Sequence, residues 1–222
     1  AECLEGIKEA CNFLNYPVVS GNVSFYNGTN KKNIYPTPVI GGVGLIKKLS
    51  KPISHNFKKT NSTIIVIGKT FGHIEQSCFL KENYSIIDGM PPEINLLNEK
   101  NNGESLFKLI DKNLVLSAHD ISNGGLITAL SEMTLTTDFG AKIRKPKNLT
   151  NLSKYFFGED QARYIVEIET KKLPVVEKVL KESNIYYENI GFTQANYFEI
   201  EGELKISTKD LFKINNQWYK NY

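Results

Sequence analysis

The sequence contains few cysteines and no long apolar run. Its 222 residues include three cysteines, which are too few for a disulfide framework. Cys3 and Cys11 fall on one predicted helix, about 12 Å apart along its axis, and this distance is too long for a disulfide bond. No apolar run reaches the length of a membrane-spanning helix. We therefore expect a protein of the reducing cytoplasm that has no membrane partner.

The sequence also lacks a strong excess of either charge. It has 27 lysines and arginines against 24 aspartates and glutamates, a formal net charge of +3. The lysines are spread along the chain rather than clustered, so we expect no nucleic-acid partner. Hydrophobic residues make up 41% of the chain and charged residues 23%, which is typical of a globular protein. This length allows one large domain or two small ones.

The most informative part of the chain lies near its start, at residues 17–46. Two apolar segments, residues 17–19 and 37–46, are bounded by turn residues and predict buried strands. A polar segment with the sequence SGNVS opens the connection between them. Before them, residues 2–15 carry apolar side chains at helical spacing and predict an amphipathic helix.

The SGNVS segment contains groups that suit a phosphorylated ligand. Gly21 lets the backbone approach a ligand closely, and consecutive N–H groups at such a place can form a concave anion nest. The amide oxygen of Asn22 suits Mg²⁺, and the hydroxyl of Ser24 suits a phosphate oxygen. The alternative is ordinary turn chemistry, because small polar residues are common between strands.

A second segment with ligand-binding chemistry lies at residues 118–126, which read AHDISNGGL. It follows a predicted strand at residues 114–117 and precedes a helix that starts near Leu126. A helix start after a glycine-bearing loop favours anions, because its unpaired N–H groups and its dipole point at the ligand. Asp120 and Ser122 are the candidate ligand-binding residues here. Alternatively, one of them only caps the helix.

Three further features bear on the fold. Residues 63–67, TIIVI, are β-branched and predict a buried strand. A proline pair at residues 91–92 predicts the start of a helix that runs to about Lys112. Residues 204–222 predict a terminal strand and helix. The apolar residues of this last segment are expected to dock on the body of the protein: Leu211, Phe212, Trp218 and Tyr219.

Three motifs carry a resemblance to a known family. They read SGNVSFYN, YPTPVIGGVGL and SAHDISNGGLITALSEM. The chain closely resembles phosphoribosylformylglycinamidine synthase, the ATP-dependent synthetase of purine biosynthesis, in its small bacterial and archaeal type. The match is to the C-terminal part of that family. Because the chain begins inside a helical pattern, we expect it to be a piece of a longer protein.

The resemblance implies an α+β or α/β sandwich built from the two domains of the aminoimidazole ribonucleotide synthetase superfamily. Residues 1–46 would be the C-terminal remnant of the nucleotide-binding half-domain. Residues 47–62, which are basic and polar, would form a linker. Residues 63–222 would form a complete synthetase-like C-terminal domain.

Two segments depart from the family pattern. Where the family has a glycine-rich stretch before a helix, residues 71–77 of this chain read FGHIEQS, and this low glycine content argues against a phosphate cradle there. Family members also carry a G-E-S-Q-like turn. Residues 158–161 read GEDQ, with Asp160 in place of the serine, and we expect this turn to be structural.

The resemblance also implies an activity. The enzyme would use ATP and Mg²⁺ to convert formylglycinamide ribonucleotide to formylglycinamidine ribonucleotide, with ammonia derived from glutamine. By the same resemblance, Gly21 would approach ATP, Asn22 bind Mg²⁺ and Ser24 bind the substrate. Asp120 would bind Mg²⁺ and Ser122 the nucleotide in a second, pseudo-symmetric site. We name no catalytic residue, because the catalytic histidines of the family belong to its N-terminal half.

The expected partners follow from the same resemblance. They are a separate glutaminase subunit, a small bridging subunit and the N-terminal half of the same protein. We expect the piece alone to be inactive, because most of the composite active site lies outside it. Two other functions stay open at this point. One is a non-catalytic structural or nucleotide-binding half, and the other is a different ATP-using member of the same superfamily.

Overall fold

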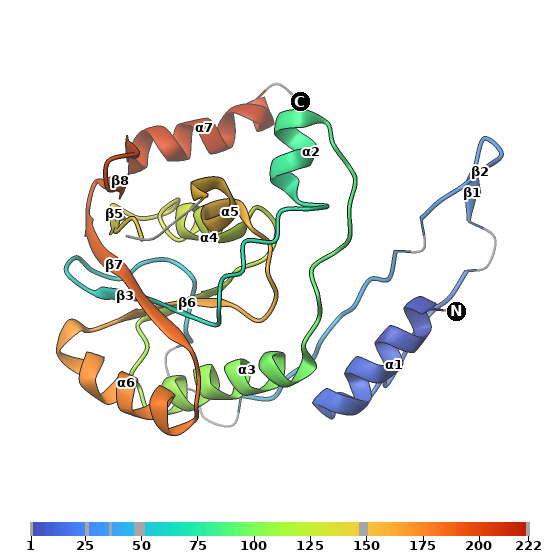
Figure 1. The fold of residues 1–222 in the computed structure, drawn as a ribbon, viewed down its shortest axis with the longest axis horizontal. Helices are drawn as coiled ribbons and strands as arrows, with labels where there is room; N and C mark the ends of the chain where they lie inside the picture. The colour runs from blue at the N-terminus through green and yellow to red at the C-terminus, as the bar shows by residue number, and fades with distance from the viewer. Residues whose placement is uncertain (1, 25–26, 36, 47–51, 147–150, 221–222) are drawn as a thin grey trace. The chain divides into compact units, whose positions relative to one another are not determined.

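The computed structural model describes residues 2–24, 27–35, 37–46, 52–146 and 151–220 (Figure 1). The chain divides into two compact units, Ala1–Lys51 and Pro52–Tyr222. None of the helices in these described ranges has both the length and the apolar character needed to cross a membrane.

The first unit contains a helix and a short hairpin. The amphipathic helix expected near the start is confirmed as α1 (Glu2–Leu14), although none of its residues is buried. The strands β1 (Gly28–Thr29) and β2 (Lys32–Asn33) pair in antiparallel fashion. Asn30 and Lys31 join them, with φ angles of 51° and 64°. Positive φ at both central residues is typical of the tight hairpin turn whose twist matches that of the strands.

The two apolar segments at residues 17–19 and 37–46 do not form strands, so the prediction of buried strands there is wrong. Their side chains are exposed, for example Val19 by 90% and Val43 by 95%. Among the described residues of the first unit, the strands are β1 and β2 alone, and every residue of both is exposed. A buried strand needs a sheet with a covered face, and these residues provide none.

A seven-stranded sheet forms the centre of the second unit, with the strand order β4-β6-β3-β7-β5-β8-β9. Among its described pairs, β5 and β8 run parallel and the other neighbours are antiparallel. The strands are β3 (Thr63–Ile67), β4 (Ser117–Asp120), β5 (Phe139–Ile143), β6 (Tyr164–Ile168), β7 (Tyr187–Ala195), β8 (Tyr197–Ile200) and β9 (Leu204–Ser207).

Helices cover both faces of this sheet. Figure 1 shows α3 and α6 on one side of it and α4 and α5 on the other. The helical segments are α2 (Cys78–Tyr84), α3 (Leu96–Asp111), α4 (Gly125–Glu132), α5 (Leu152–Phe157), the 3₁₀ turn η1 (Thr170–Lys172), α6 (Leu173–Glu182) and α7 (Thr208–Lys220). The second unit is therefore a sandwich of helices and a mixed sheet.

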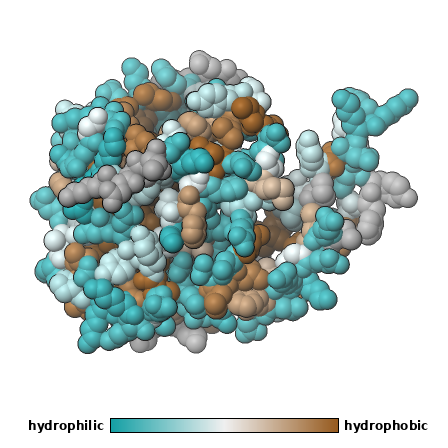
Figure 2. Space-filling view, viewed as in Figure 1, coloured by the Kyte–Doolittle hydropathy of each residue, from teal (hydrophilic) through white to brown (hydrophobic). Residues whose placement is uncertain are grey.

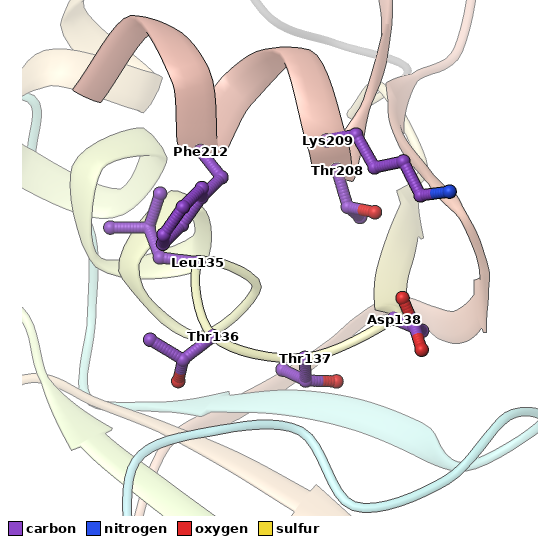
Figure 3. Close-up of a pocket in the computed structure, with 7 residues that line it drawn as sticks. All are labelled: Leu135, Thr136, Thr137, Asp138, Thr208, Lys209 and Phe212. Carbon is purple, nitrogen blue, oxygen red and sulfur yellow. The ribbon is translucent and has the colours of Figure 1, made fainter. Parts of the chain in front are cut away.

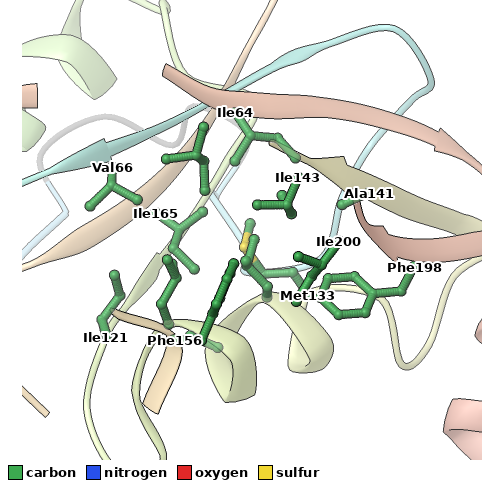
Figure 4. Packing of buried hydrophobic residues seen from close by; sticks show 14 of the residues in the cluster. Ile64, Val66, Ile121, Met133, Ala141, Ile143, Phe156, Ile165, Phe198 and Ile200 are labelled. Atoms are coloured by element: carbon green, nitrogen blue, oxygen red, sulfur yellow. The ribbon is translucent and has the colours of Figure 1, made fainter. Parts of the chain in front are cut away.

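The strand β3 explains how the sheet holds both helical layers. All of its residues are buried, as its continuous apolar run predicts. Because side chains alternate along a strand, Ile64 and Val66 point to one face and pack in the cluster with α4 and α5 (Figure 4). Ile65 and Ile67 point to the other face and pack in the cluster with α3 and α6.

The second unit begins at Pro52, within the segment 47–62 that the sequence suggests as a linker. Phe57 is 1% exposed and lies in the cluster with α4 and α5, and its N–H donates to the carbonyl of Met133 at 3.0 Å. Lys58 N–H donates to the buried carboxylate of Glu167 at 2.9 Å. Residues 52–62 are thus held in this unit, while residues 47–51 of the expected linker lie outside the described ranges.

Two elements begin later than the sequence predicts. The helix α3 starts at Leu96 rather than at the proline pair, because Asn95 caps it by accepting a hydrogen bond from Asn98 N–H at 3.0 Å. The strand expected at residues 114–117 is β4, which begins at Ser117. Its ladder with β6 extends through Asp120, so this aspartate lies on a strand and not in the following loop.

The expected docking of the last helix is largely wrong. In α7, Leu211 is partly buried, but Phe212, Trp218 and Tyr219 are exposed by 46%, 63% and 73%. The helix follows β9 directly and makes its main contacts with that strand, which leaves most of its apolar side chains in solvent. Figure 2 likewise shows apolar residues interspersed among polar ones on the face of the molecule that it draws.

Candidate functional site

The SGNVS segment is open to solvent in the first unit. Residues 20–24 are exposed and belong to no helix or strand. A Cβ atom added at Gly21 would meet nothing within 4 Å, so the first unit itself imposes no need for glycine at this position. The carbonyl of Ser24 accepts a hydrogen bond from the Asn27 side chain at 2.8 Å. The side chains of Asn22 and Ser24 are thus accessible to a ligand.

Asp120 and Ser122 lie between the end of β4 and the start of α4 in the second unit. The Asp120 side chain is 64% exposed, and its Oδ1 lies 3.2 Å from Nδ1 of His119. His119 Nε2 lies 3.1 Å from Oε2 of Glu132. Ser122 is also exposed, and its carbonyl accepts a hydrogen bond from Gly125 N–H at 3.1 Å. Both side chains therefore remain accessible.

Neither of these side chains caps α4, so the alternative that Asp120 or Ser122 is a helix cap is wrong. The capping residue is Gly124, which has no side chain to cap with and takes a φ angle of 79°. Its N–H instead donates to Oε1 of Glu159 at 2.7 Å. The cap thus comes from a residue that is distant in the sequence.

The candidate Mg²⁺ ligands of this chain are isolated oxygen atoms rather than a cluster of metal-binding side chains. Among the residues that the structure describes, no group of three or more His, Cys, Asp and Glu side chains could share a metal ion. Mg²⁺ is commonly held by one or two protein oxygens together with substrate phosphates and water. The exposed amide oxygen of Asn22 and the exposed carboxylate of Asp120 fit that kind of binding.

Glu159 joins the starts of two helices through one carboxylate oxygen. Its Oε1 accepts hydrogen bonds from the N–H groups of Gly124, before α4, and Cys78, the first residue of α2, at 2.7 and 2.8 Å. A carboxylate is favoured there because unpaired N–H groups and the helix dipole are positive. Burial, and next the charge of Glu159, raise the pKa of the Cys78 thiol.

Asp160 fills a nest of backbone N–H groups. Its Oδ2 accepts hydrogen bonds from Phe71 and Gly72 at 3.0 and 2.8 Å, and its Oδ1 accepts one from His73 at 3.0 Å. Gly72 has a φ angle of 79°, which turns consecutive N–H groups toward one point. The carboxylate is 5% exposed. The loop at residues 71–73 is therefore an anion nest, and its anion belongs to the protein.

Arg163 holds the Gly158–Asp160 turn in place from inside the second unit. It is 1% exposed, and its guanidinium donates to the carbonyls of Gly158 and Asp160 at 2.6 and 3.1 Å. It also donates to the Thr70 hydroxyl at 3.2 Å, on the segment that leads to the nest. Burial lowers the pKa of this guanidinium, and the charge of Asp160 opposes that effect.

The sequence drew attention to the GEDQ turn but not to its partners. The structural role expected for this turn agrees with the contacts above. The sequence does not predict the helix cap formed by Glu159, the hydrogen bonds of Arg163 or the nest of N–H groups at residues 71–73. The segments that form these contacts are far apart in the sequence. The structure also explains the second glycine of the SNGGL motif. Gly125 has a positive φ angle, and a Cβ atom added to it would lie 2.7 Å from the carbonyl oxygen of Gly158.

Two cavities of the second unit are relevant to ligand binding. One, of about 360 Å³, is lined by Phe71, His73, Pro92, Glu93, Asn95, Asn98, Asp160, Gln161 and Ala162. The other, of about 490 Å³, lies between the segment before β5 and the start of α7. Figure 3 shows Leu135 and Phe212 together at one end of it and Lys209 and Asp138 at the other. The second cavity contains none of the predicted site residues.

The chain matches the two domains of a class of synthetase-related proteins. The chain belongs to the AIR synthase related family. The C-terminal domain of that family matches residues 59–200, and its N-terminal domain matches residues 1–46. The predicted fold class is thereby confirmed.

Among the relatives are proteins named phosphoribosylformylglycinamidine synthase subunit PurL, which confirms the resemblance carried by the three motifs. The chain is 46% identical to the PurL of Pelagibacter ubique (strain HTCC1062) over 221 residues, covering 100% of the chain and 30% of that protein. It is 38% identical to the PurL of Rhodopseudomonas palustris (strain TIE-1) over 220 residues, covering 99% of the chain and 30% of that protein. The chain thus spans less than a third of these relatives.

Solved structures of PurL from Thermotoga maritima share the fold. The form complexed with FGAR matches with a TM-score of 0.59 and 15% identity, over 72% of this chain and 29% of that one. The form complexed with ATP matches with a TM-score of 0.54 and 13% identity, over 72% of this chain and 27% of that one. At these identities the likeness establishes the fold alone.

Proposed function

We propose that the chain is the C-terminal part of an ATP- and Mg²⁺-dependent ligase that converts formylglycinamide ribonucleotide to formylglycinamidine ribonucleotide in purine biosynthesis. The observation that carries this proposal is the 46% identity to a PurL protein over the whole length of the chain. The neighbouring PurL structures complexed with FGAR and with ATP agree with this substrate and nucleotide.

The proposed chemistry requires positioning more than a protein nucleophile. ATP would phosphorylate the amide oxygen of the substrate, and ammonia from glutamine would then displace the phosphate. Such phosphoryl transfer is helped by Mg²⁺, which neutralises phosphate charge, and by fixed hydrogen-bond donors. We assign the close approach to ATP to Gly21, a Mg²⁺ ligand to Asn22 and a substrate contact to Ser24. The exposure of residues 20–24 supports these roles.

A second nucleotide site is proposed at the start of α4. Asp120 would offer one carboxylate oxygen to Mg²⁺, and Ser122 a hydroxyl to the nucleotide. Both side chains are exposed and neither caps the helix, so both are available for these contacts. His119, which lies 3.2 Å from Asp120, would orient that carboxylate.

The remaining parts of the proposal concern partners and location. We propose that ammonia comes from a separate glutaminase subunit, that a small bridging subunit joins the assembly, and that the enzyme works in the cytoplasm. The N-terminal half of the same protein would cover the exposed apolar segment at residues 37–46, since large exposed apolar surfaces commonly mark interfaces. Alone, the chain would be inactive and act as a structural or nucleotide-binding half.

A chimera tests the function directly. In the Pelagibacter ubique PurL, the segment that matches this chain is replaced by this chain, and formation of formylglycinamidine ribonucleotide is measured with ATP, Mg²⁺ and ammonium chloride. We expect ATP-dependent product, and we expect the same chimera with Asn22→Ala to lose most of it. A folded chimera that makes no product would contradict the proposed function.

A further inference from the structure

The loop at residues 71–73 has the geometry of a phosphate site. Three consecutive N–H groups, from Phe71, Gly72 and His73, converge on one carboxylate at distances of 3.0, 2.8 and 3.0 Å. Convergent backbone N–H groups of this kind bind phosphates and other oxyanions in many proteins. In this chain the oxyanion is the side chain of Asp160, which lies 88 positions after Gly72 in the sequence.

The carboxylate of Asp160 is held in the nest from several sides. Arg163 donates to the Asp160 carbonyl at 3.1 Å, and Glu159 N–H donates to the carbonyl of His73 at 2.8 Å. The turn and the loop touch so closely that a Cβ atom added to Gly158 would lie 2.9 Å from Cα of Gly72. These bonds fix the turn against the loop, and withdrawal of the carboxylate would break its three hydrogen bonds from residues 71–73 together.

The space in front of the nest has the wrong charge for a second anion. Phe71, His73 and Asp160 all line the cavity of about 360 Å³ described above. The carboxylates that line it are those of Asp160 and Glu93, and no lysine or arginine is among its lining residues. A phosphate that entered this cavity would meet two carboxylates and three N–H groups that already have an acceptor. Arg163 Nη2 lies 3.9 Å from Asp160 Oδ2 and balances part of this negative charge, but the guanidinium is buried behind the turn and is not among the residues that line the cavity. The unbalanced negative charge opposes the binding of a second anion.

We propose that Asp160 is an internal anion that occupies a phosphate-type nest at residues 71–73 and closes it to the phosphate groups of nucleotides. The nest then serves to fasten the Gly158–Asp160 turn to the loop after β3. Removal of the Asp160 carboxylate vacates three N–H groups beside an existing cavity, and the vacated nest accepts inorganic phosphate. This inference does not depend on the proposed ligase activity.

The test is a titration of the 222-residue chain with inorganic phosphate at constant ionic strength, followed by the amide resonance of Gly72 in protein labelled with ¹⁵N-glycine. In the wild type we expect no saturable change at Gly72. In Asp160→Ala we expect a saturable shift, with phosphate binding at least about tenfold tighter than in the wild type. Glu93→Ala is the matched control, because it removes an acidic group from the same cavity and leaves the nest filled.

A second variant keeps the test informative if Asp160→Ala does not fold. Asp160→Ser keeps a polar side chain that is too short to fill the nest, so the N–H groups of residues 71–73 should exchange with solvent faster than in the wild type. Phosphate should slow that exchange in Asp160→Ser and have no effect on it in the wild type. The proposal is overturned if phosphate perturbs Gly72 in the wild type, or if it affects neither variant.

Discussion

Oε1 of Glu159 lies 2.7 Å from the N–H nitrogen of Gly124 and so provides the cap that α4 lacks in its own sequence. The same oxygen lies 2.8 Å from the N–H nitrogen of Cys78 at the start of α2. One carboxylate therefore satisfies donors at two helix starts, each of which would otherwise be left without an intrahelical partner. The turn that carries Glu159 is correspondingly important for the arrangement of both helices.

Replacement of Glu159 should destabilise the second unit. We expect Glu159→Ala to lower the free energy of unfolding by about 1–3 kcal/mol, because two N–H groups lose a charged acceptor. Glu159→Gln keeps one amide oxygen in place and should cost less. Urea denaturation measures both, with Glu104→Ala on the exposed side of α3 as control. Equal stability of Glu159→Ala and the control would contradict the shared cap.

The position of Phe57 predicts where the second unit begins. Its side chain is 1% exposed in the cluster with α4 and α5, although the sequence suggests a linker there. We expect Phe57→Ala to cost about 3–5 kcal/mol, as for other large aromatic side chains removed from a core. Phe107, which is 68% exposed on α3, provides the matched control, and Phe107→Ala should change stability by about 0.5 kcal/mol or less. A similarly small effect of Phe57→Ala would place residues 52–62 outside the folded unit.

Glu167 predicts a distinct pH dependence of stability. This carboxylate is fully buried and accepts hydrogen bonds from the Ser117 hydroxyl at 2.8 Å and Lys58 N–H at 2.9 Å. Burial raises the pKa of Glu167 above its ordinary value of 4.5, and the hydrogen bonds oppose that rise only in part. The folded state therefore holds the proton to a higher pH than the unfolded state does.

The sign of the effect follows from this difference in proton binding. Stability contributed by Glu167 is present below pH 4.5 and is lost as the pH rises through the raised pKa. Each pH unit between the two pKa values corresponds to about 1.4 kcal/mol. Urea denaturation from pH 4.5 upward should thus give a more negative slope for the wild type than for Glu167→Gln. Parallel slopes would show that burial does not raise this pKa.

The sequence predicts those helices and strands that are determined by the local pattern of apolar residues. The continuous β-branched run of β3 and the helical spacing of α1 were sufficient to identify both. Residues 37–46 have an equally apolar pattern, but they are exposed because no sheet in the described part of the first unit covers them. Pattern alone does not say whether a covering partner is present.

The sequence does not predict the contacts of the candidate site, for a different reason. A helix cap was expected from the neighbouring Asp120 or Ser122, because most caps are local. Here it comes from Glu159, which precedes β6 in the chain and lies near Gly124 because β6 pairs with β4. Likewise, nothing in the letters of residues 71–73 indicates that Asp160 is their acceptor. Such long-range hydrogen bonds depend on the topology of the sheet.

The last prediction concerns nucleotide binding by the chain itself. Calorimetric titration with Mg²⁺–ATP is expected to detect binding that Asn22→Ala weakens by at least about tenfold, because the amide oxygen of Asn22 is the proposed Mg²⁺ ligand of the SGNVS segment. Asn12→Ala, on the exposed surface of α1 in the same unit, is the control and should bind as the wild type does. Loss in Asp120→Ala alone would move the nucleotide to the start of α4. Absence of binding in the wild type would mean that residues 20–24 need a partner segment to complete the pocket, since they lie open to solvent.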